Sequence, residues 1–410
     1  MTPRPRICFL VGSMALSGGT YVIIQHAVFL QKNGFEITLA VQEAFTNETL
    51  VWHDEANLLR CIPIQAAKPL HFDLVIATWW KTALELPGFS APRYAYFVQS
   101  IESRFYSSDE IPLRQLVDDT YRLPVCYITE ATWIQRHLRD HFHHEAALVR
   151  NGIRKDVYKI DGTCIAERNP GKPRVLVEGH FGVPFKNTAL AVRLAKEARA
   201  KDIWVLTGSN VSWLPGVSKV FSRIPMVETP RIYRSCDILL KLSTVEGMFG
   251  PPLEIFHCGG TSVVFNVTGH DEYIVDGYNS RVVETGRLDQ AVEKLKSLLQ
   301  NPRELQQLKD GAKATAEKWH SWPESSAQFH VWALHALNAP ATHIDSCRDI
   351  VIKAWRDYGS EEKKRLADNP AIVRRYKRSE LTAKIPYSIK QRIKKLQATA
   401  EVCFGSREVR

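Results

Sequence analysis

Short apolar runs alternate with polar loops and helical patterns along the first 165 residues. The runs that predict buried strands are 7–11, 35–41, 73–77, 94–98 and 125–129. A pattern with helical period covers 21–32 and ends at Asn33-Gly34, a common helix stop. Apolar strands separated by helices are typical of βαβ units around a parallel sheet. We therefore expect one doubly wound α/β domain over residues 1–165.

The alternation restarts after "ERNPGKP" at 167–173, whose Pro and Gly content is typical of a linker. Further strands are predicted at 174–179, 202–208, 237–243, 262–266 and 280–284, and helices at 188–200, 288–300, 302–318 and 322–337. A second α/β domain is therefore expected over 166–337, facing the first across a cleft. Ligands of such domains bind at the carboxyl ends of the strands.

Composition is ordinary for a globular protein of this size, with 410 residues, 45% hydrophobic and 24% charged. The eight cysteines are scattered and form no CxxC pair, which predicts reduced thiols in a cytoplasmic protein. No run of about 18 apolar residues occurs, so no transmembrane helix is predicted. The apolar start is interpreted as a strand rather than a signal peptide, because a helical pattern follows it at once.

Positive charge gathers at the C-terminal end, in a tail that we expect over residues 338–410. Residues 353–410 hold 16 Lys/Arg and 7 Asp/Glu, or +9 of the net +10, which leaves 38 against 37 before them. Within the tail, residues 385–396 read as a basic amphipathic helix, with apolar positions at Ile385, Ile389, Ile393 and Leu396. This pattern favours peripheral attachment to an anionic membrane surface, at the inner face of the cytoplasmic membrane. The alternatives are a helix packed on the first domain or a nucleic-acid contact, and the neutral core disfavours nucleic acid.

Candidate chemistry concentrates in "STVEGMFGPPLEIFHCGG" at 243–260, where seven residues separate Glu246 from Glu254. Gly247 and Gly250 let backbone amides approach a ligand, and the proline pair after them suits a first helical turn. The start of that helix favours an anionic or oxygen-rich ligand. Glu254, one turn into the helix, has the two acceptor oxygens that a vicinal diol such as ribose requires. The alternative is that both glutamates are solvated residues at a helix end.

This segment resembles the glutamate–seven–glutamate signature of family 4 glycosyltransferases, which have two Rossmann-like domains facing across a cleft (GT-B). Three other segments are similar to the family in the same order, namely "GGTYVIIQHAVFLQKNGFEITL" at 18–39, "VRNGIRKDVY" at 149–158 and "VTGHDEYIVDGYNSRVV" at 267–283. The resemblance implies retaining transfer of a sugar from a nucleotide-diphosphate donor, with no metal and no cofactor beyond the UDP-, GDP- or dTDP-sugar.

The resemblance also implies the roles of individual residues. Lys186, assisted by His180, would neutralise the leaving diphosphate, Glu246 would hold the donor sugar, and Glu254 the ribose. The full implied donor site is Gly18, Gly19, His180, Lys186, Glu246, Gly247, Met248, Phe249, Gly250 and Glu254. Two departures from the family stand out. His180 replaces an arginine and so loses its bidentate fork, and Met248-Phe249-Gly250 replaces a Phe-Gly-aliphatic run.

The acceptor is expected to bind the first domain at Gln99, Glu102 and Trp79. "YFVQSIESRFY" at 96–106 resembles transferases of bacterial surface polysaccharides such as O-antigen, rhamnan or capsule, which implies a glycan or lipid-linked acceptor. Trp79-Trp80 could stack on a sugar, although core packing is the alternative. His137 and His141 have the i, i+4 spacing of zinc ligands, but no HExxH motif accompanies them, so no metal site is predicted.

Two other classes of function stay open at this point. A nucleotide-sugar epimerase or a phosphorylase can share the GT-B fold, but an epimerase would be expected to show catalytic acids of its own and a phosphorylase a much longer chain. A non-catalytic subunit that binds sugar nucleotides or glycans is the other possibility. The presence of Lys186, Glu246 and Glu254 argues against such a subunit, whereas His180 is compatible with it.

Overall fold

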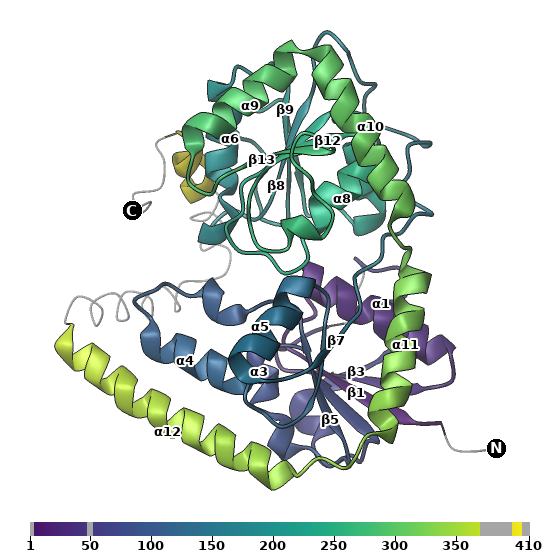
Figure 1. Cartoon of the computed structure of the whole chain (residues 1–410), viewed down its shortest axis with the longest axis vertical. Helices are drawn as coiled ribbons and strands as arrows, with labels where there is room; N and C mark the ends of the chain where they lie inside the picture. The colour runs from purple at the N-terminus through teal and green to yellow at the C-terminus, as the bar shows by residue number, and fades with distance from the viewer. Residues whose placement is uncertain (1–3, 47–51, 370–395, 404–410) are drawn as a thin grey trace. The chain divides into compact units, whose positions relative to one another are not determined.

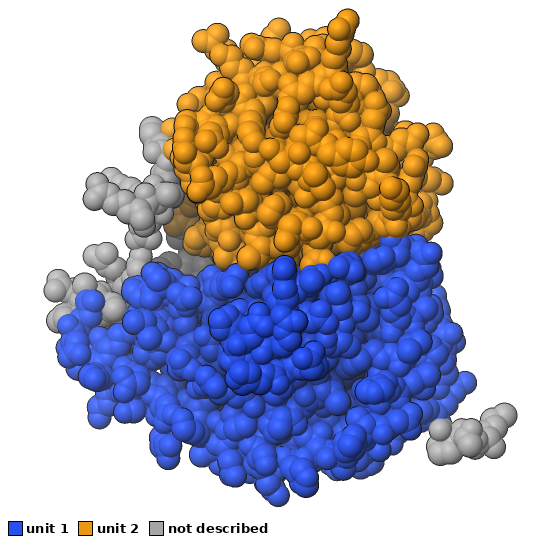
Figure 2. Space-filling model, viewed as in Figure 1, with its two compact units in different colours: residues 1–152, 320–376 blue, residues 153–319, 377–410 orange. Residues whose placement is uncertain are grey.

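A computed structural model describes residues 4–46, 52–369 and 396–403 of the chain. By their internal contacts the residues divide into two compact units, 1–152 with 320–376, and 153–319 with 377–410 (Figure 2). Each unit is a parallel sheet covered on both faces by helices, as Figure 1 shows. The prediction of two doubly wound α/β domains is therefore confirmed.

The first unit contains a seven-stranded sheet in the order β3-β2-β1-β4-β5-β6-β7, with every neighbouring pair parallel. Its strands are β1 (Arg6–Val11), β2 (Glu36–Val41), β3 (Arg60–Pro63), β4 (Leu74–Ala77), β5 (Tyr94–Val98), β6 (Cys126–Thr129) and β7 (Ala146–Leu148). Its helices are α1 (Gly18–Lys32), α2 (Ile64–Ala67), α3 (Trp80–Ala83), α4 (Ile111–Thr120), α5 (Thr132–Phe142), α11 (Trp322–Asn338) and α12 (Ile344–Asp368). Alternate residues of β1 face opposite layers, because Phe9 packs with the α1 and α11 side and Leu10 with the α4 and α12 side.

The second unit contains a six-stranded parallel sheet in the order β10-β9-β8-β11-β12-β13. Its strands are β8 (Val175–Glu178), β9 (Ile203–Thr207), β10 (Lys219–Ser222), β11 (Ile238–Lys241), β12 (Thr261–Phe265) and β13 (Ser280–Val283). Its helices are α6 (Thr188–Glu197), α7 (Thr229–Ser235), α8 (Gly250–His257), α9 (Leu288–Gln300) and α10 (Pro302–Lys318). Helices α6 and α9 cover one face of this sheet, α7 and α8 cover the other, and α10 contributes buried residues to both cores.

The units divide the chain at other positions than the predicted boundaries of 165 and 337. The difference at the C-terminal side concerns α11, which packs on the first unit (Figure 1). Phe329 of α11 is fully buried there and stacks on His26 of α1, with 4.2 Å between the ring centroids. Helical periodicity predicts that a helix has an apolar face, but it does not say which sheet that face covers.

The C-terminal region contributes to both units. Helix α12 runs beside α4 on the first unit, where Cys347 and Ala354 are buried (Figure 1). Residues 396–403 are helical, and Ala398 and Val402 are buried in the core of the second unit together with α6 and α9. The helical C-terminal region is therefore confirmed. The predicted amphipathic helix at 385–396 lies, apart from Leu396, outside the described residues.

Two further observations concern membrane-spanning helices and disulfides. None of the helices in the described residues is long and apolar enough to cross a bilayer. The eight cysteines, which all lie in the described residues, form no disulfide with one another.

Candidate functional site

In each unit the strand order reverses at one point, between β1 and β4 in the first and between β8 and β11 in the second. Loops diverge from the sheet at such a point and leave a crevice at the carboxyl ends of the strands. In the second unit the loops after β8 and β11 are tied together there. The amide of Thr244 donates to the carbonyl of Phe185 at 2.8 Å, and Asn187 Nδ2 donates to the carbonyl of Leu242 at 2.9 Å. These bonds hold Lys186 against the loop that carries Glu246.

The turn after β8 requires a glycine at its start. Gly179 has φ +155°, and a Cβ at this position would lie 2.4 Å from Oγ1 of Thr188. The chain then passes through a short 3₁₀ turn, Pro184–Lys186, to Asn187, whose left-handed φ of 50° begins α6. This tight path brings Lys186 back over the end of the sheet.

Lys186 and Glu246 form a close ion pair. Nζ of Lys186 lies 2.8 Å from both carboxylate oxygens of Glu246, so a single ammonium donates to the two oxygens. Glu246 is only 8% exposed. Burial alone would raise the pKa of Glu246, but the charges of Lys186 and Lys241 together lower it below its ordinary value. The structure therefore brings together two of the predicted site residues, with the carboxyl group ionised.

Lys241 and Glu178 form a second pair beside the first, and sequence reasoning missed both residues. Lys241 ends β11 and is 2% exposed, and its Nζ donates to Oε2 of Glu178, at the end of β8, at 2.5 Å. The same Nζ lies 3.7 Å from Oε1 of Glu246. Burial opposes the charge of Lys241, but Glu178 and Glu246 raise its pKa above the ordinary value. The sequence did carry one signal for this pair, namely a single lysine within the apolar run "DILLKLS". A lysine in a buried strand requires a partner of opposite charge, so its position predicts a nearby carboxylate.

Glu254 lies in α8, the helix that begins at Gly250 with Pro251 and Pro252 in its first turn, as predicted. Burial raises the pKa of Glu254 to about 7; a hydrogen bond from Tyr233 lowers it, and the nearby carboxylate of Glu178 raises it further. The carboxyl group therefore interacts electrostatically with Glu178 and Lys241 and is hydrogen-bonded to the hydroxyl of Tyr233.

His180 is neutral at pH 7. Burial lowers the pKa of its imidazole, and the positive charges of Lys186, Lys241 and Arg223 lower it further against the influence of Glu178. Its ring packs on Gly208, where an added Cβ would lie 2.2 Å from Cε1 of the imidazole. His180 can thus offer a ligand a hydrogen bond, but no fixed charge.

The residues of the 247–250 loop differ in what they can present to a ligand. The side chain of Phe249 is fully buried in the core of the second unit, and Tyr273 donates its hydroxyl hydrogen to the carbonyl of Phe249. Met248 is partly buried against the same core. Gly247 and Gly250 carry no side chain, so the backbone of this loop is the part that can approach a ligand.

The predicted residues of the first unit surround the turn that leads into α1. Gly18 and Gly19 occupy the first turn of α1, where amides have no partner within the helix. A Cβ on Gly19 would lie 3.3 Å from Oε1 of Gln99, and a Cβ on Gly12 only 2.5 Å from the indole of Trp79. Gln99 and Trp79 therefore border the glycine turn at the strand-order reversal of this unit.

Glu102 lies apart from these groups. It is 6% exposed and accepts hydrogen bonds from the amide of Trp80, at 2.8 Å, and from the hydroxyl of Tyr96, at 3.2 Å. Burial raises the pKa of Glu102 to about 8. Its carboxyl group thus joins β5 to α3 inside the first unit. Trp80, 3% exposed, is a core residue, whereas Trp79 is partly buried.

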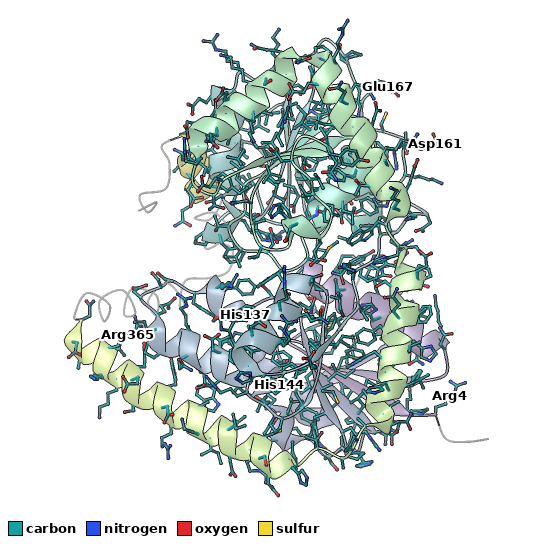
Figure 3. All side chains as sticks on the ribbon, viewed as in Figure 1. Arg4, His137, His144, Asp161, Glu167 and Arg365 are labelled. Atoms are coloured by element: carbon teal, nitrogen blue, oxygen red, sulfur yellow. The ribbon has the colours of Figure 1, made fainter. Side chains whose placement is uncertain are left out.

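The histidine cluster of the sequence lies at the end of α5 in the first unit, where Figure 3 labels His137 and His144. The rings of His137 and His141 are 4.4 Å apart between centroids, and burial lowers the pKa of His137 to about 4. The ring of His144 stacks on Tyr127. Within the described part of the chain, no group of three His, Cys, Asp or Glu side chains is arranged to hold a metal ion.

Comparison with known proteins agrees with this geometry. Residues 214–315, all in the second unit, match the family described as glycosyl transferases group 1. The part of the second unit that holds Glu246 and Glu254 is thus similar to a group 1 glycosyltransferase domain. No curated protein sequence matches the chain significantly.

Solved glycosyltransferase structures share the fold of the chain at low sequence identity. Sucrose-phosphate synthase from Thermosynechococcus elongatus superimposes with a TM-score of 0.64 at 13% identity, over 81% of this chain and 99% of its own. HepE of Anabaena, in complex with UDP and glucose, gives 0.63 at 14% over 81% and 100%. WaaG, a glycosyltransferase involved in lipopolysaccharide biosynthesis, gives 0.60 at 14% over 79% and 99%. The chain thus has the two-domain GT-B fold.

Proposed function

We propose that the protein is a retaining glycosyltransferase that takes its sugar from a nucleotide-diphosphate donor. The observation that carries this proposal is the pairing of Lys186 with Glu246 where β8 and β11 end, with Glu254 in the helix that follows. A diphosphate needs a cation, and sugar and ribose hydroxyls need carboxylate acceptors. The group 1 family match over 214–315 supports the same conclusion.

In the proposed reaction the bond between the anomeric carbon and the diphosphate breaks as the acceptor oxygen bonds to the same face of that carbon. The acceptor's proton passes to a leaving phosphate oxygen, so no separate general base is required. Lys186 neutralises the charge that develops on the diphosphate, and neutral His180 donates a hydrogen bond to it. Glu246 accepts from the donor sugar, Glu254 from the ribose, and the amides of the 247–250 loop hold the sugar's oxygens.

The cations of the protein supply the positive charge in this scheme, so the proposed transfer is independent of metal ions. Added EDTA should therefore leave the rate unchanged. HepE binds UDP and UDP-glucose, and WaaG acts in lipopolysaccharide biosynthesis. By analogy we propose a UDP-sugar as the first donor to test, and a glycan or lipid-linked acceptor of a surface polysaccharide.

The acceptor is proposed to bind beside the glycine turn of the first unit, where Gln99 and Trp79 border Gly19 and Gly12. The partly buried indole of Trp79 offers a face on which a sugar ring can stack. Glu102 then acts on the acceptor site indirectly, by fixing the amide of Trp80 next to Trp79. The amides of Gly18 and Gly19, in the first turn of α1, are proposed to bind an anionic group of a ligand.

Donor binding and hydrolysis test the proposal directly. UDP-, GDP- and dTDP-sugars are screened for an increase in melting temperature, which a specific ligand produces by binding the folded state. Lys186→Met removes charge-assisted hydrogen bonds worth about 1.5–3 kcal/mol each, so donor affinity should fall about 10- to 100-fold. Lys201→Met, at an exposed position of the same unit, is the matched control. Equal hydrolysis rates in the wild type and Lys186→Met would refute the catalytic assignment.

We further propose that the basic tail attaches the enzyme to the inner face of the cytoplasmic membrane. Nine Lys/Arg between 371 and 395, against one acidic residue, support attraction to anionic lipid. The test replaces Lys390, Arg392, Lys394 and Lys395 by Gln, because a deletion would also remove Ala398 and Val402 from the core of the second unit. Binding to vesicles that contain phosphatidylglycerol should fall, while transfer to a soluble acceptor persists. Unchanged vesicle binding would contradict the proposal.

A further inference from the structure

We infer that Lys241 is a positioning residue of the donor site, which serves as the permanent counter-ion of Glu246 when Lys186 leaves it for the donor's phosphates. This inference rests on the proposed function. It assigns a role to a buried lysine that neither the family match nor the sequence motifs single out.

The geometry of Lys186 creates the need for a second cation. Its ammonium donates to both oxygens of Glu246 at 2.8 Å, so the two charges neutralise each other before a donor arrives. When a donor diphosphate binds Lys186, the carboxylate of Glu246 loses one of its neighbouring cations. It remains only 8% exposed, so water does not replace that cation. A buried carboxylate without a counter-ion takes up a proton, and it then loses part of its capacity to accept hydrogen bonds from a sugar.

Lys241 is placed to meet that need. Its Nζ lies 3.7 Å from Oε1 of Glu246, and it donates to Oε2 of Glu178 at 2.5 Å and, at the longer distance of 3.5 Å, to the carbonyl of Glu178. Its side chain is 2% exposed, against 24% for Lys186. Lys186 can therefore exchange between Glu246 and a ligand, whereas Lys241 stays in the sheet and never contacts the ligand.

The charged groups around the pair set the direction of the pH effect. Glu246 is paired with Lys186 and lies near Lys241, and its charge also raises the pKa of Tyr273. Because both lysines lower the pKa of Glu246, the loss of Lys241 raises that pKa. Glu246 then takes up a proton at a higher pH. The fall of donor affinity on acidification, called the acid limb of donor binding, therefore shifts to a higher pH.

Lys241 has further titratable neighbours in Glu178, Glu254 and His180. A purely structural role is the competing explanation, in which Lys241 only neutralises Glu178. The two explanations differ when both members of that pair become neutral. Lys241→Met combined with Glu178→Gln leaves no unpaired charge at the pair, so a structural role predicts wild-type donor binding. Our inference predicts that donor binding stays impaired, because Glu246 still lacks its second cation.

The experiment measures donor affinity and donor hydrolysis from pH 5 to 8 in four variants, each combined with Glu254→Gln, because Glu254 has a pKa of about 7 that Glu178 raises and Lys241 lowers. The reference is Glu254→Gln alone, and adding Glu178→Gln to it should leave donor binding unchanged. Lys241→Met with Glu178→Gln should bind the donor about 10- to 100-fold more weakly at pH 6, with the acid limb about one pH unit higher or more. Lys241→Arg should leave the pH dependence of donor binding unchanged, because the positive charge beside Glu246 is preserved. Lys309→Met is the matched control, since Lys309 pairs at 2.5 Å with Asp237 at the opposite end of β11.

A measurement without donor separates this inference from the proposed function. The carboxyl carbon of Glu246 is titrated by ¹³C NMR in Lys186→Met, which mimics departure of the lysine, with and without the Lys241→Met and Glu178→Gln changes. The pKa of Glu246 should rise by about one unit or more when Lys241 is also removed. If the wild type binds no nucleotide-sugar, the proposed function fails, but this titration still decides the role of Lys241. An unchanged Glu246 titration, or wild-type donor binding in the double variant, overturns the inference. If the double variant does not fold, Lys241→Gln with Glu178→Gln gives the same comparison.

Discussion

Glu254 should make the second unit less stable as the pH rises, and Glu254→Gln should remove this dependence. Its pKa in the folded protein is about 7, against an ordinary value of 4.5. Below pH 4.5 the carboxyl group is protonated in both the folded and the unfolded state and costs nothing. Between 4.5 and 7 it ionises only when unfolded, so the free energy of unfolding falls, and above 7 the penalty is constant.

The size of the effect follows from the shift. A difference of about 2.5 pKa units at 1.36 kcal/mol each gives a full penalty of about 3 kcal/mol, of which about 2.5 kcal/mol develops between pH 5 and 8. For a unit of this size, 1 kcal/mol corresponds to roughly 2–4 °C in melting temperature. Relative to the wild type, Glu254→Gln should therefore gain roughly 5–10 °C between pH 5 and pH 8.

Differential scanning calorimetry of both proteins at the two pH values provides the test. The comparison uses the change in the mutant-minus-wild-type difference, so any constant cost of the amide cancels. Glu293→Gln, at an exposed position on α9, should show no such change. If the difference for Glu254→Gln is the same at pH 5 and pH 8, burial does not raise the pKa of this carboxyl group in the folded protein.

Three other substitutions test separate parts of the structure. Phe329→Ala should lower the free energy of unfolding of the first unit by about 3–5 kcal/mol in urea titrations, because this ring is fully buried, whereas Val331→Ala, at a residue 68% exposed on the same helix, should change it by less than about 0.5 kcal/mol. Gly12→Ala should displace the indole of Trp79, which lies 2.5 Å from the new Cβ, and should slow transfer to the acceptor while donor hydrolysis stays unchanged. His180→Gln should leave the pH dependence of donor binding between pH 6.5 and 8 as in the wild type, because burial lowers the pKa of His180 and keeps it neutral there; a changed dependence measured by calorimetric titration would mean that the imidazole is charged.

Apolar runs in the sequence predicted the interior strands of both sheets and the edge strand β13, and they did not predict three other strands. The missed strands are β3, β7 and β10, each at the edge of its sheet. β3 and β10 hold no fully buried residue, and β7 holds one. A short, half-exposed edge strand lacks the continuous apolar run that identifies an interior strand.

The candidate site could be predicted as far as local spacing determines it. Glu246, Glu254 and the start of α8 come from one continuous segment, so their arrangement was visible in the sequence. The role of Lys241 was not, because its partner Glu178 is 63 residues away and meets it only when β8 and β11 pair. Whether a lysine is buried and what neutralises it are properties of the folded sheet rather than of the local sequence.

The attachment of α11 to the first unit affects the order in which the chain can fold during translation. Residues 1–152 leave the ribosome well before the helix that brings Phe329 and Trp332 to their core, because the whole of 153–319 is made in between. The nascent first unit therefore lacks the packing partner of Phe9 and His26 while the second unit is being synthesised. A fragment that ends before residue 320 leaves these side chains without α11, which makes it a natural substrate for chaperones and prone to aggregation.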